Sequence, residues 1–280
     1  MKFKTKYFSY PYLVLMAIFI ILPILLVLLY SFTEKSVDGI TSIKFTLDNF
    51  GKFFQPMYLS ILGKSLRLAI LSTIICLIIG FPVAYIISKS DISKRSVLLF
   101  LCILPMWMNM LLRTYAWMTI LGNNGLINQF IMFLGLPRQK LLYNDFAVVL
   151  GMVYNFLPFM VLPIYTGLSK LDKHFIEAAE DLGANSFTVF RKIIIPLSMP
   201  GVVSGIIMVF MPAVSTFIIP RLLGGSKDLV VGSLIENLFI TSGDWNFGSA
   251  IAIIMMIIIL IAMTIMNRFD IDKGESTGLW

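Results

Sequence analysis

Long apolar runs separated by short polar stretches dominate the chain. Six runs are long enough to cross a bilayer, whose hydrocarbon core of roughly 30 Å needs about 20 helical residues. Runs such as 251–261 do not alternate between apolar and polar residues, so a membrane β-barrel is excluded. We therefore predict an all-α integral membrane protein with six transmembrane helices, at about 10–32, 66–88, 97–121, 146–168, 193–219 and 248–267.

The connecting segments contain no linker, so a single transmembrane domain over residues 1–280 is expected. The first run is too long for a signal-peptide core and is not followed by a small-residue cleavage site, so it is predicted to be retained. An apolar patch between Gly125 and Gly135 predicts a short helix lying at the membrane interface. The tail at 269–280 is polar and is expected to fray.

Lys and Arg are unevenly distributed between the two sets of loops. Twelve lie in the two terminal segments and the loops after the second and fourth runs, and eight are spread over the three longer loops. Because cytoplasmic loops carry the excess of positive charge, both termini are predicted to be cytoplasmic. The loop at 170–192 then also faces the cytoplasm.

The composition agrees with a membrane protein and excludes several other classes. Hydrophobic residues make up 58% of the chain, charged residues 13%, and mean hydropathy is +0.91. In soluble domains, apolar residues make up about 45–50% and charged residues about 25%. The net charge of +7 is interpreted as cytoplasmic loops facing anionic lipid, not as nucleic-acid binding. With His174 as the only histidine, multi-histidine metal sites are not available, and Cys76 and Cys102 both fall in apolar runs.

Signatures of enzymes and proton-coupled carriers are missing. Gly63-Lys64-Ser65 resembles the end of a phosphate-binding loop, but Tyr58 stands where the upstream glycine is required and no strand precedes it. The six runs hold no Asp or Glu, which argues against a relay of protons through buried carboxylates. We predict a non-catalytic membrane subunit that binds neither metal nor cofactor itself.

Arg113 is the only charged residue well inside a run. Counted from residue 97 along a helix, it lies about 24 Å from the cytoplasmic end. One interpretation is a gating residue. The alternative is a structural arginine that extends to the surface or binds backbone carbonyls.

Prolines interrupt several runs and should break or bend the helices there. They are Pro23, Pro82, Pro105, Pro158, Pro163, Pro212 and Pro220. Amphipathic side chains near these breaks are candidates for a translocation pathway, because asparagine facing lipid would be costly. An interfacial aromatic belt is the alternative. The candidates are Trp107, Asn109, Tyr115, Tyr154, Asn155 and Tyr165.

The loop between the fourth and fifth runs has the pattern of a compact helix–turn–helix. Glu177–Leu182 favours a short helix, on which Ala178 and Ala179 form a small face that another surface can approach. Gly183 permits a turn, and Asn185 or Ser186 can cap a second helix.

Glu177-Ala178-Ala179-x-x-x-Gly183, followed at a distance by Ile193-x-Ile195-Pro196, resembles the EAA motif of ABC importer permeases. Ile195 replaces the usual leucine, a conservative change. The resemblance implies a type I importer permease bundle whose coupling residues are Glu177, Ala178, Ala179, Asp181 and Gly183. It further implies that this loop docks in a groove of a partner ATPase, which binds ATP and Mg²⁺.

Further motifs are similar to the B-type permeases of spermidine/putrescine importers. They are Thr46–Phe50, Leu104-Pro105-x-Trp107, Arg113–Tyr115, Leu157–Tyr165, Met211–Ala213, Leu222–Gly225 and Asp244–Gly248. This resemblance implies a bacterial inner-membrane location, a related C-type permease as partner, two ATPase copies, and an extracytoplasmic polyamine-binding protein. Iron, thiamine or phosphonate importers remain alternatives, as does a self-sufficient carrier or channel.

Overall fold

The computed structural model describes residues 9–34, 44–225 and 229–271, and all elements in these ranges are helical apart from an isolated bridge between Thr33 and Phe45. Five helical segments are long and apolar enough to cross a membrane, and a bent pair supplies a sixth if it counts as one span. This confirms the predicted all-helical membrane fold.

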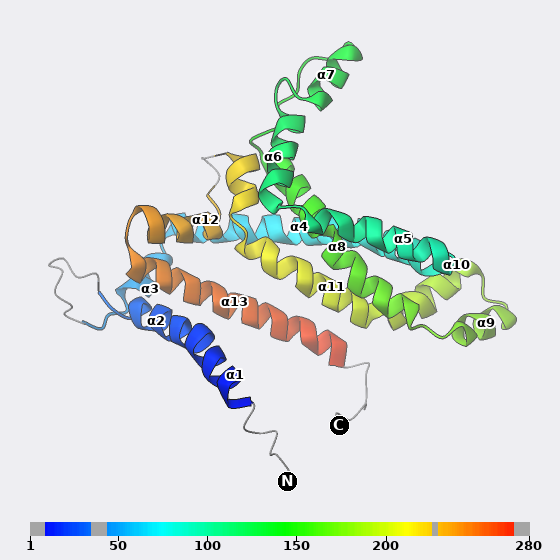
Figure 1. The fold of residues 1–280 in the computed structure, drawn as a ribbon, viewed down its shortest axis with the longest axis horizontal. Helices are drawn as coiled ribbons and strands as arrows, with labels where there is room; N and C mark the ends of the chain where they lie inside the picture. Colours follow the sequence, from blue (N-terminus) through cyan, green and yellow to red (C-terminus); the bar gives the residue numbers. More distant parts are fainter. Residues whose placement is uncertain (1–8, 35–43, 226–228, 272–280) are drawn as a thin grey trace, which may run out of the picture. The chain divides into compact units, whose positions relative to one another are not determined.

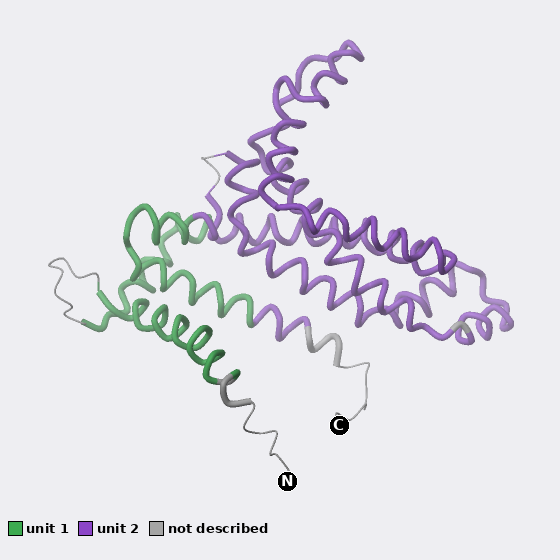
Figure 2. Tube along the Cα trace, in the orientation of Figure 1, with its two compact units in different colours: residues 1–61, 234–260 green, residues 62–233, 261–280 purple. Residues whose placement is uncertain are grey.

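Contacts within the chain divide it into two units (Figure 2): residues 1–61 with 234–260, and residues 62–233 with 261–280. The boundaries fall inside helices α4, α12 and α13, so they do not mark linkers.

Unit 1 begins with a continuous apolar helix made of α1 (Ser9–Met16), η2 (Ala17–Ile21) and α2 (Leu22–Ser31). Most of its large side chains are exposed, which is typical of a helix facing lipid or another subunit. The unit also contains α3 (Asp48–Phe53), the start of α4, the second half of α12 (Val231–Glu236), η6 (Asn237–Thr241) and most of α13 (Trp245–Ile271).

Two asparagines close the end of α2. Asn246 Nδ2 donates to the carbonyl oxygens of Tyr30 (3.1 Å) and Thr33 (2.9 Å) and to Thr33 Oγ1 (2.8 Å). Asn49 Nδ2 donates to the carbonyl oxygens of Ser31 and Thr33. The last carbonyls of a helix have no partner within it, so these buried amides satisfy groups that would otherwise be unpaired. The Asp48-Asn49-Phe50 and Asp244–Gly248 motifs thus meet at one helix end.

Unit 2 contains most of α4 (Pro56–Lys89), α5 (Ile92–Ile103), η3 (Leu104–Trp107), α6 (Met110–Leu121), α7 (Leu126–Phe133), α8 (Asp145–Ser169), α9 (Lys173–Asp181), α10 (Ser186–Val189), η4 (Phe190–Ile194), α11 (Ile195–Ser215) and η5 (Pro220–Gly224). Figure 1 shows α9 at one end of α8, with α6 and α7 towards the other end. The short helix predicted between Gly125 and Gly135 is α7, which confirms that element.

The core of unit 2 is the pairing of α8 with α11, the most extensive helix contact in the described chain. A Cβ on Gly201 would lie 2.7 Å from the carbonyl oxygen of Pro163 and 3.3 Å from Ile164 Cα. Only glycine allows two helix backbones to approach this closely, as is common between membrane helices.

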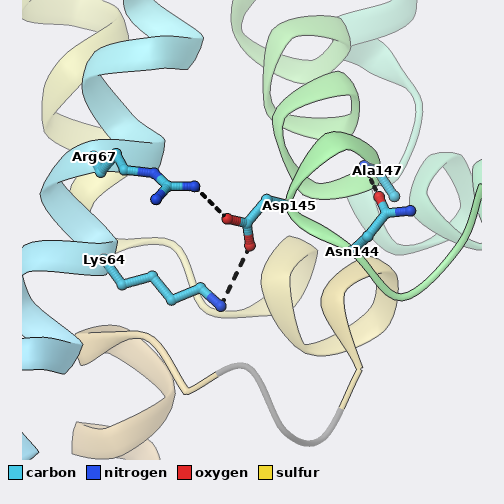
Figure 3. Close-up of polar contacts among 5 residues, drawn as sticks. All are labelled: Lys64, Arg67, Asn144, Asp145 and Ala147. Carbon is cyan, nitrogen blue, oxygen red and sulfur yellow. Dashed lines mark hydrogen bonds and ion pairs between the residues drawn. The ribbon is translucent and has the colours of Figure 1, made fainter.

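The N-terminal end of α8 is held by two ion pairs and a side-chain cap (Figure 3). Asp145 lies 3.3 Å from Lys64 Nζ and 2.8 Å from Arg67 Nη2, both on α4. Asn144 Oδ1 accepts from the backbone N–H of Ala147 at 2.8 Å. These contacts fix the start of the helix that leads to the predicted coupling loop.

The third predicted span is broken. Ile92–Trp107 and Met110–Phe133 are bent by 92°, with extended backbone at Met108 and Asn109 between them. Pro105 lacks a backbone N–H, and Asn109 Oδ1 accepts from the N–H of Leu111 (2.8 Å), which starts a new helix in another direction. A single helix over 97–121, and the 24 Å rise to Arg113 derived from it, are therefore wrong.

Other boundaries also differ from the prediction. The second span extends over Pro56–Lys89, and the fifth extends over Ser186–Ser215 instead of 193–219. A Cβ on Gly232 would lie 2.6 Å from the Ser215 carbonyl oxygen, so a neighbouring segment packs directly on the point where α11 ends. The sixth helix continues to Ile271, inside the tail predicted at 269–280, and 272–280 lie outside the described residues.

We predict that Gly201→Ala lowers the free energy of unfolding by about 1–3 kcal/mol, because its methyl group would overlap the backbone of α8. Thermal unfolding of the detergent-purified chain measures this effect. Gly63→Ala on α4 is the matched control, since a Cβ there meets nothing within 4 Å. Equal stability of the two variants would show that the close approach of α8 and α11 does not hold.

Candidate functional site

The predicted coupling segment folds as a short helix, a turn and a second helix. Asp172 Oδ1 accepts from the backbone N–H of His174 at 3.0 Å, so an aspartate caps the start of α9. The helix begins at Lys173, earlier than the predicted Glu177, and ends at Asp181. Glu177 Oε2 lies 3.4 Å from His174 Nδ1 on the exposed side.

Gly183 forms the turn that ends α9. Its φ is +83°, a region that L-residues with side chains rarely adopt. Gly183 N–H donates to Glu180 O (2.9 Å), and Ala184 N–H donates to Ala179 O (3.0 Å). This pair of bonds is the Schellman arrangement, which satisfies the last carbonyls of the helix. The predicted turn at Gly183 is confirmed.

Asn185 caps the following helix. Its Oδ1 accepts from Thr188 N–H at 2.8 Å, and the helix continues without a break through η4 into α11. Of the two capping residues that the sequence offered, the structure uses Asn185. The turn is therefore linked rigidly to a membrane helix.

The surface of this loop is exposed and partly apolar. Glu177, Ala178 and Asp181 are exposed, and Ala179 is half-buried. Three large apolar side chains that the sequence analysis did not select are also exposed: Phe175 (59%), Phe187 (70%) and Leu182 (89%). The signal in the sequence was their presence in an otherwise polar loop. Such a patch beside acidic residues suits a protein partner.

The six pathway candidates are divided between the broken third span and α8. Trp107, Asn109 and Tyr115 are exposed, Tyr154 and Tyr165 are half-buried, and Asn155 is buried. Trp107 packs against Phe100, and Tyr154 packs edge-on against Trp117, with ring centroids 5.8 Å and 5.4 Å apart. None of these ring contacts, and none of the hydrogen bonds described for Asn109 and Asn155, joins one of the six to another.

Arg113 lies on the buried face of α6. Its side chain is 8% exposed, so it does not extend to the surface. Its Nε and Nη1 atoms are buried and have no acceptor among the described residues, and the Tyr154 phenol lies within electrostatic range. Asn155 Nδ2 donates to Gly151 O (2.8 Å), whereas its Oδ1 is buried without a donor from the described chain. Unsatisfied polar groups of this kind are costly in a single arrangement of the helices.

A groove of about 700 Å³ runs between α8 and α11. Its walls are mostly apolar, with polar groups from Thr166, Ser204 and Lys170. None of the six pathway candidates lines it. The sequence signal that could have identified it is the set of small residues spaced along α11, which allow a neighbouring chain or a solute to approach.

The described residues offer no group of three or more His, Cys, Asp or Glu side chains that could hold a metal ion. Gly63-Lys64-Ser65 lies inside continuous helix α4, so it has no loop that could wrap a phosphate.

Comparison with known proteins agrees with this fold. The family described as binding-protein-dependent transport system inner membrane component matches residues 76–271. The spermidine/putrescine transport system permease protein PotB of Haemophilus influenzae is 39% identical over 252 residues, covering 89% of this chain and 88% of that protein. PotB of Escherichia coli is 38% identical over 245 residues, covering 87% and 89%.

Two crystal structures share the fold at low identity. A bacterial ABC transporter for the import of alginate aligns with a TM-score of 0.79 and 16% identity over 95% of this chain and 94% of that chain. The alginate transporter in complex with an alginate-bound periplasmic protein aligns with a TM-score of 0.77 and 15% identity, over 94% and 92%. The family match, the near-complete alignment with PotB proteins and the apolar helices show that this chain is a multi-pass inner-membrane protein and belongs to the permease subunits of ABC importers.

Proposed function

We propose that this chain is the B-type permease of an ATP-driven importer of polyamines such as spermidine and putrescine. The observation that supports this substrate is the identity of 38–39% to PotB proteins over almost the whole of both chains. The proposed orientation, with both termini and α9 in the cytoplasm, follows from the distribution of Lys and Arg.

The proposed assembly contains a related C-type permease, two copies of a cytoplasmic ATPase that bind ATP and Mg²⁺, and an extracytoplasmic polyamine-binding protein. The exposed α9 surface, with Glu177, Ala178 and Asp181 beside Phe175 and Leu182, is the proposed docking site for the ATPase. Because Asn185 joins the turn to α11 through continuous helix, a movement of α9 is transmitted into the membrane core.

Transport in this proposal proceeds by alternating access. Closure of the ATPase pair moves α9 and α11, and the broken third span changes its packing on α8. Arg113 repels a polycation, so its role is gating or structural and not ligand binding. Two of its buried nitrogen atoms have no acceptor, so a conformation that supplies one would be lower in energy. Arg113 could in this way make the two conformations of the transport cycle differ in energy.

The first test is ATP hydrolysis by the complete importer in proteoliposomes. We expect the binding protein loaded with spermidine or putrescine to stimulate hydrolysis several-fold, and thiamine or iron to have no effect. Stimulation by another ligand would support the importer function but contradict the assignment of polyamine as the substrate. Polyamine flux through this chain alone, without ATPase, would contradict the coupled mechanism.

Gly183→Val should uncouple transport. A β-branched residue at φ +83° costs about 1–2 kcal/mol, which lowers the population of the native turn by a factor of roughly 5–30. Polyamine-stimulated ATP hydrolysis is expected to fall accordingly while the complex still assembles. Gly135→Val is the matched control, because Gly135 has a φ of +78° and equally open surroundings but lies after α7. Equal losses in both variants would reduce the effect to general instability.

Trp107→Ala and Tyr154→Ala should each raise the KM for polyamine uptake by about 2- to 30-fold, because an aromatic face attracts ammonium groups with about 0.5–2 kcal/mol. Tyr154→Phe keeps the ring and should transport almost normally. Phe133→Ala, on the exposed end of α7, serves as an aromatic control. Uptake that is unchanged in both alanine variants would remove these residues from the pathway.

A further inference from the structure

A cavity of about 270 Å³ lies beside the coupling helix. The end of α4 contributes Ser88 and Lys89, α5 contributes Arg95, and the end of α8 contributes Ser169. Ile176 of α9 forms part of its wall. The cavity therefore lies where three membrane helices end next to the predicted ATPase-docking segment.

Both charged side chains that line the cavity are cations, Lys89 and Arg95, and no acidic side chain lines it. The nearest acid in the sequence, Asp91, pairs instead with Lys94 at 3.3 Å, and both of those side chains are exposed. Lys89 Nζ lies 5.9 Å from the centre of the Tyr85 ring and has no ion-pair partner among the described residues. The lining of the cavity thus carries positive charge and no acidic side chain.

Arg95 is held in a fixed orientation with a spare donor. Its Nη2 donates to the carbonyl oxygens of Ser88 (2.7 Å) and Ser90 (3.4 Å), at the end of α4. Its Nε is buried and has no acceptor in the described part of the chain. The guanidinium group belongs to the cavity lining, and an anion there would gain charge-assisted hydrogen bonds from it.

We propose that this cavity binds the phosphate group of a small ligand. Phosphate oxygens accept hydrogen bonds from guanidinium and ammonium groups, and Arg95 and Lys89 supply one of each to the lining. The volume lies just below the usual range of about 300–1,000 Å³ for ligand pockets, which is enough for phosphate or a glycerophosphate head group. The ligand is either a phospholipid head group or free phosphate.

A phosphate bound here would contact α4 and α5 and border α9. Its presence would therefore affect the packing of α9 against these two helices. This consequence rests on the proposed coupling function, as does the placement at the cytoplasmic leaflet. The binding itself depends on neither and is measured on the full-length chain without the ATPase. Failure of polyamine transport and failure of phosphate binding are therefore distinguishable.

The test compares wild type with Arg95→Gln and Lys89→Gln, and uses Lys94→Gln as matched control because Lys94 lies one residue from Arg95 but is exposed and pairs with Asp91. Lys89→Gln leaves the bonds from Arg95 to the carbonyls intact, so it tests the site without removing that structural contact. Native mass spectrometry measures binding of phosphatidylglycerol against diacylglycerol, and phosphorus NMR measures binding of inorganic phosphate.

We expect Arg95→Gln and Lys89→Gln each to weaken phosphate binding roughly tenfold, as for loss of one charge-assisted hydrogen bond, with Lys94→Gln unchanged. This pattern with phosphatidylglycerol, and not with diacylglycerol, would identify a lipid head group. The same pattern with inorganic phosphate would identify a free ligand. Absence of binding, or equal binding by all four proteins, would overturn the proposal.

Discussion

A bilayer offers no water to hydrogen-bond with the chain, so each helix end or break near it needs a partner from the protein. Asparagine side chains meet this requirement at several points in the structure. Three start helices by accepting from backbone N–H groups: Asn109, Asn144 and Asn185. Two others, Asn49 and Asn246, donate to carbonyls at the end of α2. The positions at which the chain turns are thus set by these amides, and the placement of the predicted site depends on them.

The spans could be predicted from the sequence because hydropathy is a local property, and most residues of each apolar run are helical. The boundaries could not, since polar residues at the end of a run extend a helix as readily as they end it. Pro56–Lys89 includes Lys64 and Arg67, whose charges are used by Asp145. At the end of α11, Gly232 of another segment packs against the Ser215 carbonyl, a tertiary contact that no local pattern reveals.

The candidate site shows the same division. The turn at Gly183 and the cap at Asn185 were predictable because both depend on the backbone of a few consecutive residues. Asn109 was selected as costly in lipid, and the structure accounts for it as a helix cap. Whether Trp107 and Tyr154 share a pathway depends on tertiary and subunit packing, which residue type does not reveal. The cationic cavity near α9 was missed because Lys89 and Arg95 were interpreted only as topological charges.

The right-angle break before α6 changes how position along the chain translates into depth. A helix turned through 92° gains almost no height, so if α5 crosses the bilayer upright, the rise counted from residue 97 stops near Trp107, at roughly 15 Å. Arg113, Tyr115 and Trp117 then share a similar depth and differ in lateral position. The third span therefore contains a segment that runs parallel to the membrane plane as well as one that crosses it. On the same assumption, Arg113 lies nearer the middle of the hydrocarbon than a straight helix would place it.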